Sequence, residues 1–271
     1  MLILLYSLVF FFGAISASFF NAWAERTIAQ KPIFGARSAC PRCGQRIKFF
    51  DLAPVFSWLV LRGRCRACGQ KIAGQYFWTE IILGLIFVLI AFHFDLVGTG
   101  AGFELAMFWP AFFAWVLAAV LLAIFIVDLK KFIIPNKFLW LLLATAVVSW
   151  VVLFALKLID GQFIINRVLA GLLFFVLFAL IFFISGGRWL GFGDVKYFLL
   201  SGFLLSFAGF FLMIMLASLT GSLVGIGQIL FAGKNLKSKL PFGVFLAPAT
   251  LVAYLWGGQW LDYIFKLYLY L

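Results

Sequence analysis

Two aspartates stand out among the nine acidic residues of the 271-residue chain, because they lie at the ends of long apolar runs. Asp128 follows one such run, and Asp194 precedes another in a segment that also holds Gly191 and Gly193. Ionisable groups at membrane depth are costly and are therefore candidates for function. Two carboxylates brought together cannot both ionise easily, so one can keep its proton while the other activates a water molecule. The pair predicts acid–base hydrolysis, and the glycines would let a substrate come close.

Each aspartate also has a structural interpretation. Aspartate is a good N-cap, so Asp194 alone could simply begin a helix. Asp128 is a poor candidate for capping, because a carboxylate at a helix C-terminus meets the negative end of the helix dipole. A solvated loop position is the alternative for Asp128. Asn136, which follows Pro135, is expected to cap the next helix.

The four cysteines form two pairs with two residues inside each pair and 21 residues between the pairs. Each pair is followed by glycine, which allows the backbone to turn back. Four thiolates at this spacing can complete a closed tetrahedral zinc site, which is structural. A redox pair and idle thiols are the alternatives, and a cytoplasmic position disfavours disulfides. The pattern predicts Zn²⁺ bound by Cys40, Cys43, Cys65 and Cys68.

The composition identifies a membrane protein. Hydrophobic residues make up 66% of the chain and charged residues only 11%, whereas soluble domains have about 25% charged residues. The apolar runs are continuous rather than alternating, which favours membrane helices over a barrel. We expect an all-α polytopic membrane protein with about eight transmembrane helices and a cytoplasmic zinc-binding insert after the first. The expected helices are 2–24, 76–95, 104–128, 137–157, 166–185, 195–206, 208–231 and 241–257.

The expected organisation has four parts. Residues 1–24 form the first helix, which we interpret as a retained span rather than a signal peptide, because it lacks a basic start and a clear cleavage site. Residues 25–75 form the insert, and residues 76–257 form the transmembrane core. Residues 258–271 form a tail whose tryptophan and tyrosines suit the membrane interface.

The net charge of +12 comes from basic residues that cluster in alternate loops. Ten of the 21 lysines and arginines lie within 25–75. This positive-inside bias places the insert in the cytoplasm and both termini outside. The lipid bilayer is therefore the expected partner, and no nucleic acid is expected. The remaining clusters are Lys130, Lys131 and Lys137, then Arg188 and Lys196, then Lys234, Lys237 and Lys239.

The ordered motifs resemble those of the type IV prepilin peptidases, which cut leader peptides and methylate the new N-terminus. The two cysteine pairs, Asp128 followed by Pro135-Asn136, and Gly191-Phe-Gly193-Asp194-Val-Lys196 match the family's insert, D-x6-P-N and G-x-G-D-x-K. The segment from Gly13 to Asn21 is similar to the family's G-S-F-x-N. Three positions depart from the family's R-Y-P and P-F-G-P-F motifs, namely Gln75, Phe77 and Val244.

The resemblance implies a bacterial inner-membrane enzyme whose active site faces the cytoplasm and whose peptidase core is 76–257. It implies substrates that are prepilins or pseudopilins with short basic leaders, as in type IV pilus and type II secretion systems. It also implies S-adenosyl-L-methionine as methyl donor. The catalytic residues would be Asp128 and Asp194, and the supporting motif residues would be Gly191, Gly193, Lys196, Pro135 and Asn136.

Three further acids are candidates for docking the basic leader, namely Glu25, Asp51 and Glu80. Other classes of protein would use the same features differently. A presenilin-like intramembrane aspartic protease also has two aspartates, but it carries them deeper in its helices. An ion-coupled transporter would be expected to show repeated halves. A zinc-bearing scaffold without chemistry would tolerate loss of Asp128.

Overall fold

A computed structural model describes residues 2–33, 38–40, 42–96, 105–232 and 240–269. Within these ranges the chain is helical and has no strand, apart from two isolated β-bridges in the insert. The helices are α1 Leu2–Ile28, η1 Phe49–Leu52, α2 Phe56–Val60, α3 Gly74–His93, α4 Leu105–Lys131, α5 Asn136–Ala155, α6 Gly161–Ser185, α7 Phe192–Leu204, α8 Phe207–Ala232 and α9 Gly243–Leu269.

The structure confirms that the predicted segments are helices. Each of the eight expected spans coincides with one of α1 and α3 to α9. Among the described residues, six helices are long and apolar enough to cross a membrane, namely α1, α3, α4, α5, α6 and α8. The predicted break between the sixth and seventh spans is found between Leu204 and Phe207. It leaves α7 with only 13 residues, or about 20 Å at 1.5 Å per residue.

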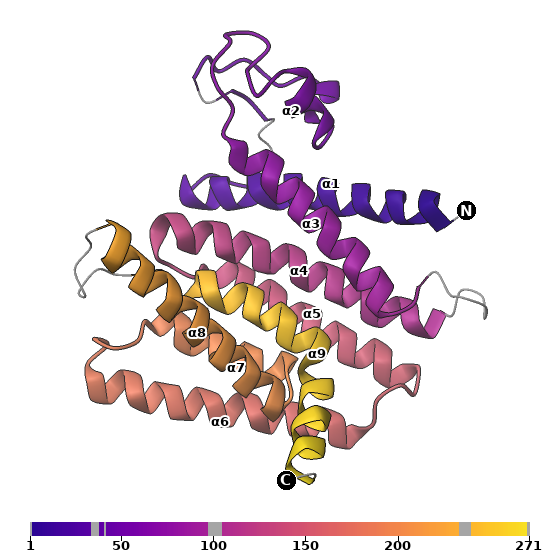
Figure 1. The fold of residues 1–271 in the computed structure, drawn as a ribbon, viewed down its shortest axis with the longest axis vertical. Coiled ribbons are helices and arrows are strands. Elements are labelled where there is room, and N and C mark those ends of the chain that lie inside the picture. The colour runs from indigo at the N-terminus through magenta and orange to yellow at the C-terminus, as the bar shows by residue number, and fades with distance from the viewer. Residues whose placement is uncertain (1, 34–37, 41, 97–104, 233–239, 270–271) are drawn as a thin grey trace.

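The bundle is organised around α4, in which 72% of the most apolar 18-residue stretch is buried. Helices α1 and α3 cover one side of α4, and α5 and α9 cover the other (Figure 1). Farther from α4, α6 packs against α7 and α8 packs against α9. The termini of α4, α5, α7 and α9 that carry the candidate motifs are thereby brought to the same region of the bundle.

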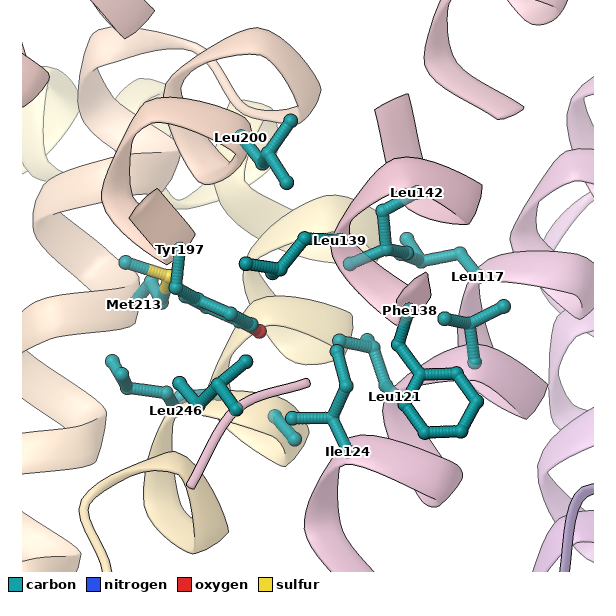
Figure 2. Packing of buried hydrophobic residues seen from close by; sticks show 14 of the residues in the cluster. Leu117, Leu121, Ile124, Phe138, Leu139, Leu142, Tyr197, Leu200, Met213 and Leu246 are labelled. Atoms are coloured by element: carbon teal, nitrogen blue, oxygen red, sulfur yellow. The ribbon is translucent and has the colours of Figure 1, made fainter. Parts of the chain in front are cut away.

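The main core lies behind this region and joins α4, α5, α7 and α9, among others. Leu121 and Ile124 of α4 meet Phe138 of α5, Tyr197 of α7 and Leu246 of α9, as Figure 2 shows. All five side chains are buried. A buried hydroxyl needs a partner, and that of Tyr197 lies 2.6 Å from the Thr250 hydroxyl of α9. Apolar packing and this hydrogen bond therefore fix α7 against α9 close to Asp194.

Glycines allow α7 to approach α6 closely. A Cβ atom added at Gly202 would lie 2.4 Å from the Cα atom of Gly171 on α6, a separation that only a glycine pair tolerates. The C-terminal end of α7 is held by a second contact, in which Arg167 of α6 donates a hydrogen bond of 2.6 Å to the Leu204 carbonyl. Arg167 thus satisfies one of the carbonyls that a helix end leaves unpaired.

The last helix extends beyond its predicted end. α9 begins at Gly243 and continues to Leu269, so residues 258–269 of the expected C-terminal tail are helical. The interfacial position of this tail stays a prediction. The basic cluster of Lys234, Lys237 and Lys239 lies outside the described residues.

Candidate active site and metal centre

Asp128 lies in the last turn of α4, but its carboxylate interacts with another helix. Its Oδ2 atom accepts a hydrogen bond of 3.1 Å from the backbone N–H of Val244, in the first turn of α9. A Cβ atom at Gly243 would lie only 2.8 Å from the same oxygen. The residue is 4% exposed. The carboxylate therefore lies at the positive end of the α9 dipole, which compensates for its unfavourable place on α4.

Asp194 is the third residue of α7, and its Oδ2 atom accepts a hydrogen bond of 3.3 Å from the Gly191 N–H. The side chain is half-buried. The capping interpretation is thus partly right, because the carboxylate satisfies an N–H at the start of the helix. Capping does not exclude chemistry, because an ionised carboxylate keeps further acceptor positions when one oxygen accepts an N–H.

The segments around the two aspartates are joined directly. Lys196 of α7 donates a hydrogen bond of 3.1 Å from its Nζ atom to Oδ1 of Asn136. A Cβ atom at Gly193 would lie 3.5 Å from the Ile134 side chain, just before Pro135. The structure thereby brings the D-x6-P-N and G-x-G-D-x-K motifs together.

The expectation that Asn136 caps the fourth span is wrong. The N-cap residue of α5 is Pro135, and Asn136 is the first residue inside the helix. The side-chain oxygen of Asn136 is used by Lys196 rather than by an N–H of its own helix. The local pattern suggested a cap, whereas a contact 60 residues away decides the role of the side chain.

The site can perform acid–base chemistry on a bound water or carbonyl. It presents one buried and one half-buried carboxylate, each with a backbone N–H as partner. These hydrogen bonds favour the charged forms, whereas two negative charges placed close together repel each other. One proton shared between two carboxylates satisfies both tendencies, and the apparent pKa values then belong to the pair.

Sequence reasoning missed Gly243 and Val244 as neighbours of Asp128. They lie about 116 residues further along the chain, in the segment Leu240-Pro-Phe-Gly243-Val244. The signal was present, because a proline and a glycine before an apolar run mark a helix start. Nothing in the local pattern indicated which carboxylate that helix start would face.

The insert brings the four predicted cysteines together. Their Sγ atoms all lie within 4.8 Å of one another, and those of Cys40 and Cys68 are 3.9 Å apart. Four thiolates at Zn–S distances of about 2.3 Å would be about 3.8 Å apart in a tetrahedron. The cluster could therefore hold a metal ion with little rearrangement.

Both halves of the cysteine cluster have the same local structure. The N–H of Gly44 donates to the Cys40 carbonyl, and the N–H of Gly69 donates to the Cys65 carbonyl, at 3.0 and 2.9 Å. Both glycines have φ near +70°, which glycine adopts without strain. Backbone N–H groups of Cys43 and Arg42 lower the pKa of the Cys40 thiol to about 6, which favours the thiolate that binds metals.

The three acids considered for docking are all engaged within the chain. Glu25 of α1 forms an ion pair with Lys130 of α4. Asp51 forms one with Arg66 at 2.7 Å, and this hydrogen bond lowers the pKa of Asp51. Glu80 of α3 is buried and accepts a 2.7 Å hydrogen bond from the Val55 N–H. Their role in docking a leader stays a prediction.

Two protein-family models match the chain. Residues 11–94 match the bacterial peptidase A24 N-terminal domain, and residues 115–226 match the type IV leader peptidase family. The two matched regions contain the cysteine insert and the two aspartates respectively. No solved structure matches the chain.

Several relatives carry the name prepilin leader peptidase/N-methyltransferase. The protein of Aeromonas salmonicida (strain A449) is 31% identical over 228 residues, which are 82% of this chain and 72% of that protein. The protein of Bacillus subtilis (strain 168) is 28% identical over 265 residues, which are 96% of this chain and 98% of that protein. With its two carboxylates at neighbouring helix ends and a four-cysteine insert, this chain belongs to the type IV leader peptidase family.

Proposed function

We propose that the chain is a prepilin leader peptidase that cuts the short basic leaders of prepilins and pseudopilins. Its catalytic residues are Asp128 and Asp194. The observation that carries this proposal is that the segments holding the two aspartates are joined, through the hydrogen bond from Lys196 of α7 to Asn136 at the start of α5. The names of the relatives supply the substrate class. The position of both acids at helix ends does not favour a presenilin-like protease or an ion-coupled transporter.

In the mechanism, the two aspartates share one proton. The ionised carboxylate takes a proton from a water molecule, whose oxygen attacks the scissile carbonyl carbon. The protonated carboxyl group donates a hydrogen bond to the carbonyl oxygen and later supplies a proton to the leaving amine. Gly191 and Gly193, which lack side chains beside Asp194, leave room for the extended substrate backbone. The hydrogen bond between Lys196 and Asn136 holds the two motifs next to each other.

The substrate and the site are matched in depth. A prepilin carries an apolar helix after its leader, so the bond that is cut lies where the helix leaves the membrane. Asp128 and Asp194 lie at ends of helices, where such a bond would be presented. We place this end of the bundle at the cytoplasmic face of the inner membrane, because the basic loops lie on this side.

We further propose that the enzyme methylates the new N-terminus with S-adenosyl-L-methionine. The relatives' names support this second activity. We assign no residue to it. The cysteine cluster holds structural Zn²⁺ through Cys40, Cys43, Cys65 and Cys68, since four ligands leave no position open for catalysis.

The decisive experiment measures prepilin cleavage by membranes that contain the wild type, Asp128→Asn or Asp194→Asn. Each substitution keeps the size of the side chain but removes its acid–base function. We expect cleavage to fall by about 10²–10⁴-fold in each variant. The precursor and mature bands are compared on a gel at equal amounts of inserted enzyme.

Asp95→Asn provides the matched control. Asp95 has φ of +47°, a conformation that asparagine also adopts readily, and it lies at the opposite end of α3 from the insert. This variant should cleave like the wild type. Normal cleavage by either Asp128→Asn or Asp194→Asn would remove that residue from the mechanism.

A further inference from the structure

The middle of the insert exposes an apolar surface that a cytoplasmic loop would not be expected to carry. Phe49 in η1 is 91% exposed, and Val60 in α2 is 75% exposed. Phe50, Phe56 and Leu59 are also exposed. Large exposed apolar patches in otherwise polar segments mark sites that contact a membrane or another protein.

The position of this surface indicates contact with the membrane. The ring of Phe56 stacks on that of Phe11 in α1, with centroids 5.6 Å apart. Phe11 precedes the C-terminal end of α1, Ile28, by 17 residues, or about 26 Å along the helix. Figure 1 shows the insert beside the C-terminal half of α1 rather than beyond the end of this helix. The apolar surface therefore lies alongside the bilayer-spanning part of α1.

The same segment is fastened to α3. Glu80, six residues into α3, accepts the N–H of Val55 at 2.7 Å. The Trp58 ring stacks on Phe77 of α3, with centroids 4.6 Å apart. Val55 has φ of +65°, which is strained for a β-branched residue and persists only where surrounding contacts enforce it. The contacts with α1 and α3 thus hold the segment at a defined depth.

The backbone of the segment suits an apolar environment. Polar backbone groups in lipid must be satisfied within the protein. The N–H groups of Leu59, Leu61 and Gly63 donate to carbonyls of Val55, Ser57 and Trp58, at 3.1, 2.9 and 2.8 Å. Glu80 satisfies Val55 itself.

Basic residues flank the segment on both sides. Arg46 and Lys48 precede it, and Arg62, Arg64 and Arg66 follow it. The one acid within it, Asp51, is neutralised by Arg66. An apolar face bordered by cations has the chemistry of a helix that lies in the interface of a bilayer with anionic lipids.

We propose that residues 49–61 form a membrane element that packs against α1 and α3 and enters the lipid from the cytoplasmic side. Its apolar side chains enter the acyl region of the adjoining leaflet from the side of α1 and α3, and its flanking cations bind the phosphates of anionic lipids. This surface continues the exposed apolar side of α1. Only 17% of the most apolar 18-residue stretch of α1 is buried within the protein. The cysteine pairs at either end of the segment remain in water. This inference does not depend on the catalytic assignment.

The test uses the full chain in liposomes of phosphatidylcholine and phosphatidylglycerol. A nitroxide amino acid is incorporated genetically at Val60, or at exposed Gln70, two residues after the second cysteine pair, as a matched control. Power-saturation electron paramagnetic resonance then compares collisions with oxygen, which enters lipid, and with a water-soluble nickel chelate. We expect severalfold more collisions with oxygen than with nickel at Val60, and the reverse at Gln70.

A second label at Phe49 keeps the test valid if substitution at Val60 disturbs the insert. The proposal is overturned if nickel reaches the labels at Val60 and Phe49 as readily as the label at Gln70. It is also overturned if the labels are shielded from nickel only at high protein density and together with spin–spin broadening. A second copy of the chain would then cover the surface.

Discussion

At the scale of single residues, the two aspartates have matching environments, and the local sequence indicates only that of Asp194. Each carboxylate accepts a backbone N–H at the start of a helix, Asp128 from Val244 and Asp194 from Gly191. Within the part of the chain that the structure describes, backbone N–H groups rather than cations therefore support the negative charge. Backbone donors are fixed in place, so they hold the carboxylates in the orientation that chemistry requires.

Val244 permits a direct test of this environment. Proline at this position has no N–H to donate, although proline is tolerated in the first turn of a helix. Without this hydrogen bond the ionised form of the aspartate pair is less stable, so the pair binds protons at higher pH. For Val244→Pro we expect the acid limb of the pH–rate profile for prepilin cleavage to move to higher pH by about one unit.

Val244→Ala is the matched control, because alanine keeps the N–H and shortens only the side chain. Its pH–rate profile should coincide with that of the wild type. An unchanged acid limb in Val244→Pro would mean that this hydrogen bond does not influence the reacting carboxylates.

At the scale of elements, the position of α7 depends on its contact with α6. Since a Cβ at Gly202 would meet the Gly171 backbone at 2.4 Å, Gly202→Ala must displace α7. Overpacking of this kind costs about 1–3 kcal/mol. We expect a lower temperature of unfolding in detergent and reduced cleavage, because Asp194 moves with its helix.

Gly227→Ala on α8 is the comparison, because an added Cβ there meets no atom within 4 Å. Stability and cleavage should be unchanged or slightly improved in this variant, since alanine favours helix more than glycine. Equal stability of the Gly202 and Gly227 variants would contradict the close contact between α6 and α7.

The insert should depend on its metal. We expect wild-type protein to contain one zinc per chain by elemental analysis, and Cys65→Ser to contain little or none. Loss of the ion should make residues 25–75 sensitive to limited proteolysis while the helical core persists, because so short a segment has little core of its own. Gln70→Ala, two residues after the same cysteine pair, should retain zinc. Full zinc content in Cys65→Ser would contradict a four-thiolate site.

At the scale of the whole molecule, composition and continuous apolar runs were sufficient to predict the membrane helices, even the break before Phe207. The contacts between distant segments were not predictable. Nothing local to Asn136 indicated Lys196 as its partner, and nothing local to Asp128 indicated the start of α9. Helix periodicity is a local property, whereas the pairing of helix ends depends on the packing of the whole bundle.

The orientation of the molecule can be tested with topology reporters. Reporters fused after Lys131, beyond the end of α4, should be active only in the cytoplasm. Reporters fused after Asp160, between α5 and α6, should be active only outside. Our assignment follows from the basic residues concentrated on the Lys131 side, and the opposite pattern would invert the molecule and the proposed active face.

The shortness of α7 has a consequence for the supply of water. A helix of about 20 Å beside a hydrocarbon layer of about 30 Å creates a mismatch, which a bilayer relieves by becoming thinner locally. α7 begins beside Asp194 and ends at the carbonyl held by Arg167. We expect thinning at this helix to draw the aqueous boundary toward the carboxylates. Because hydrolysis consumes one water for each bond cut, such thinning would bring the second substrate to the site.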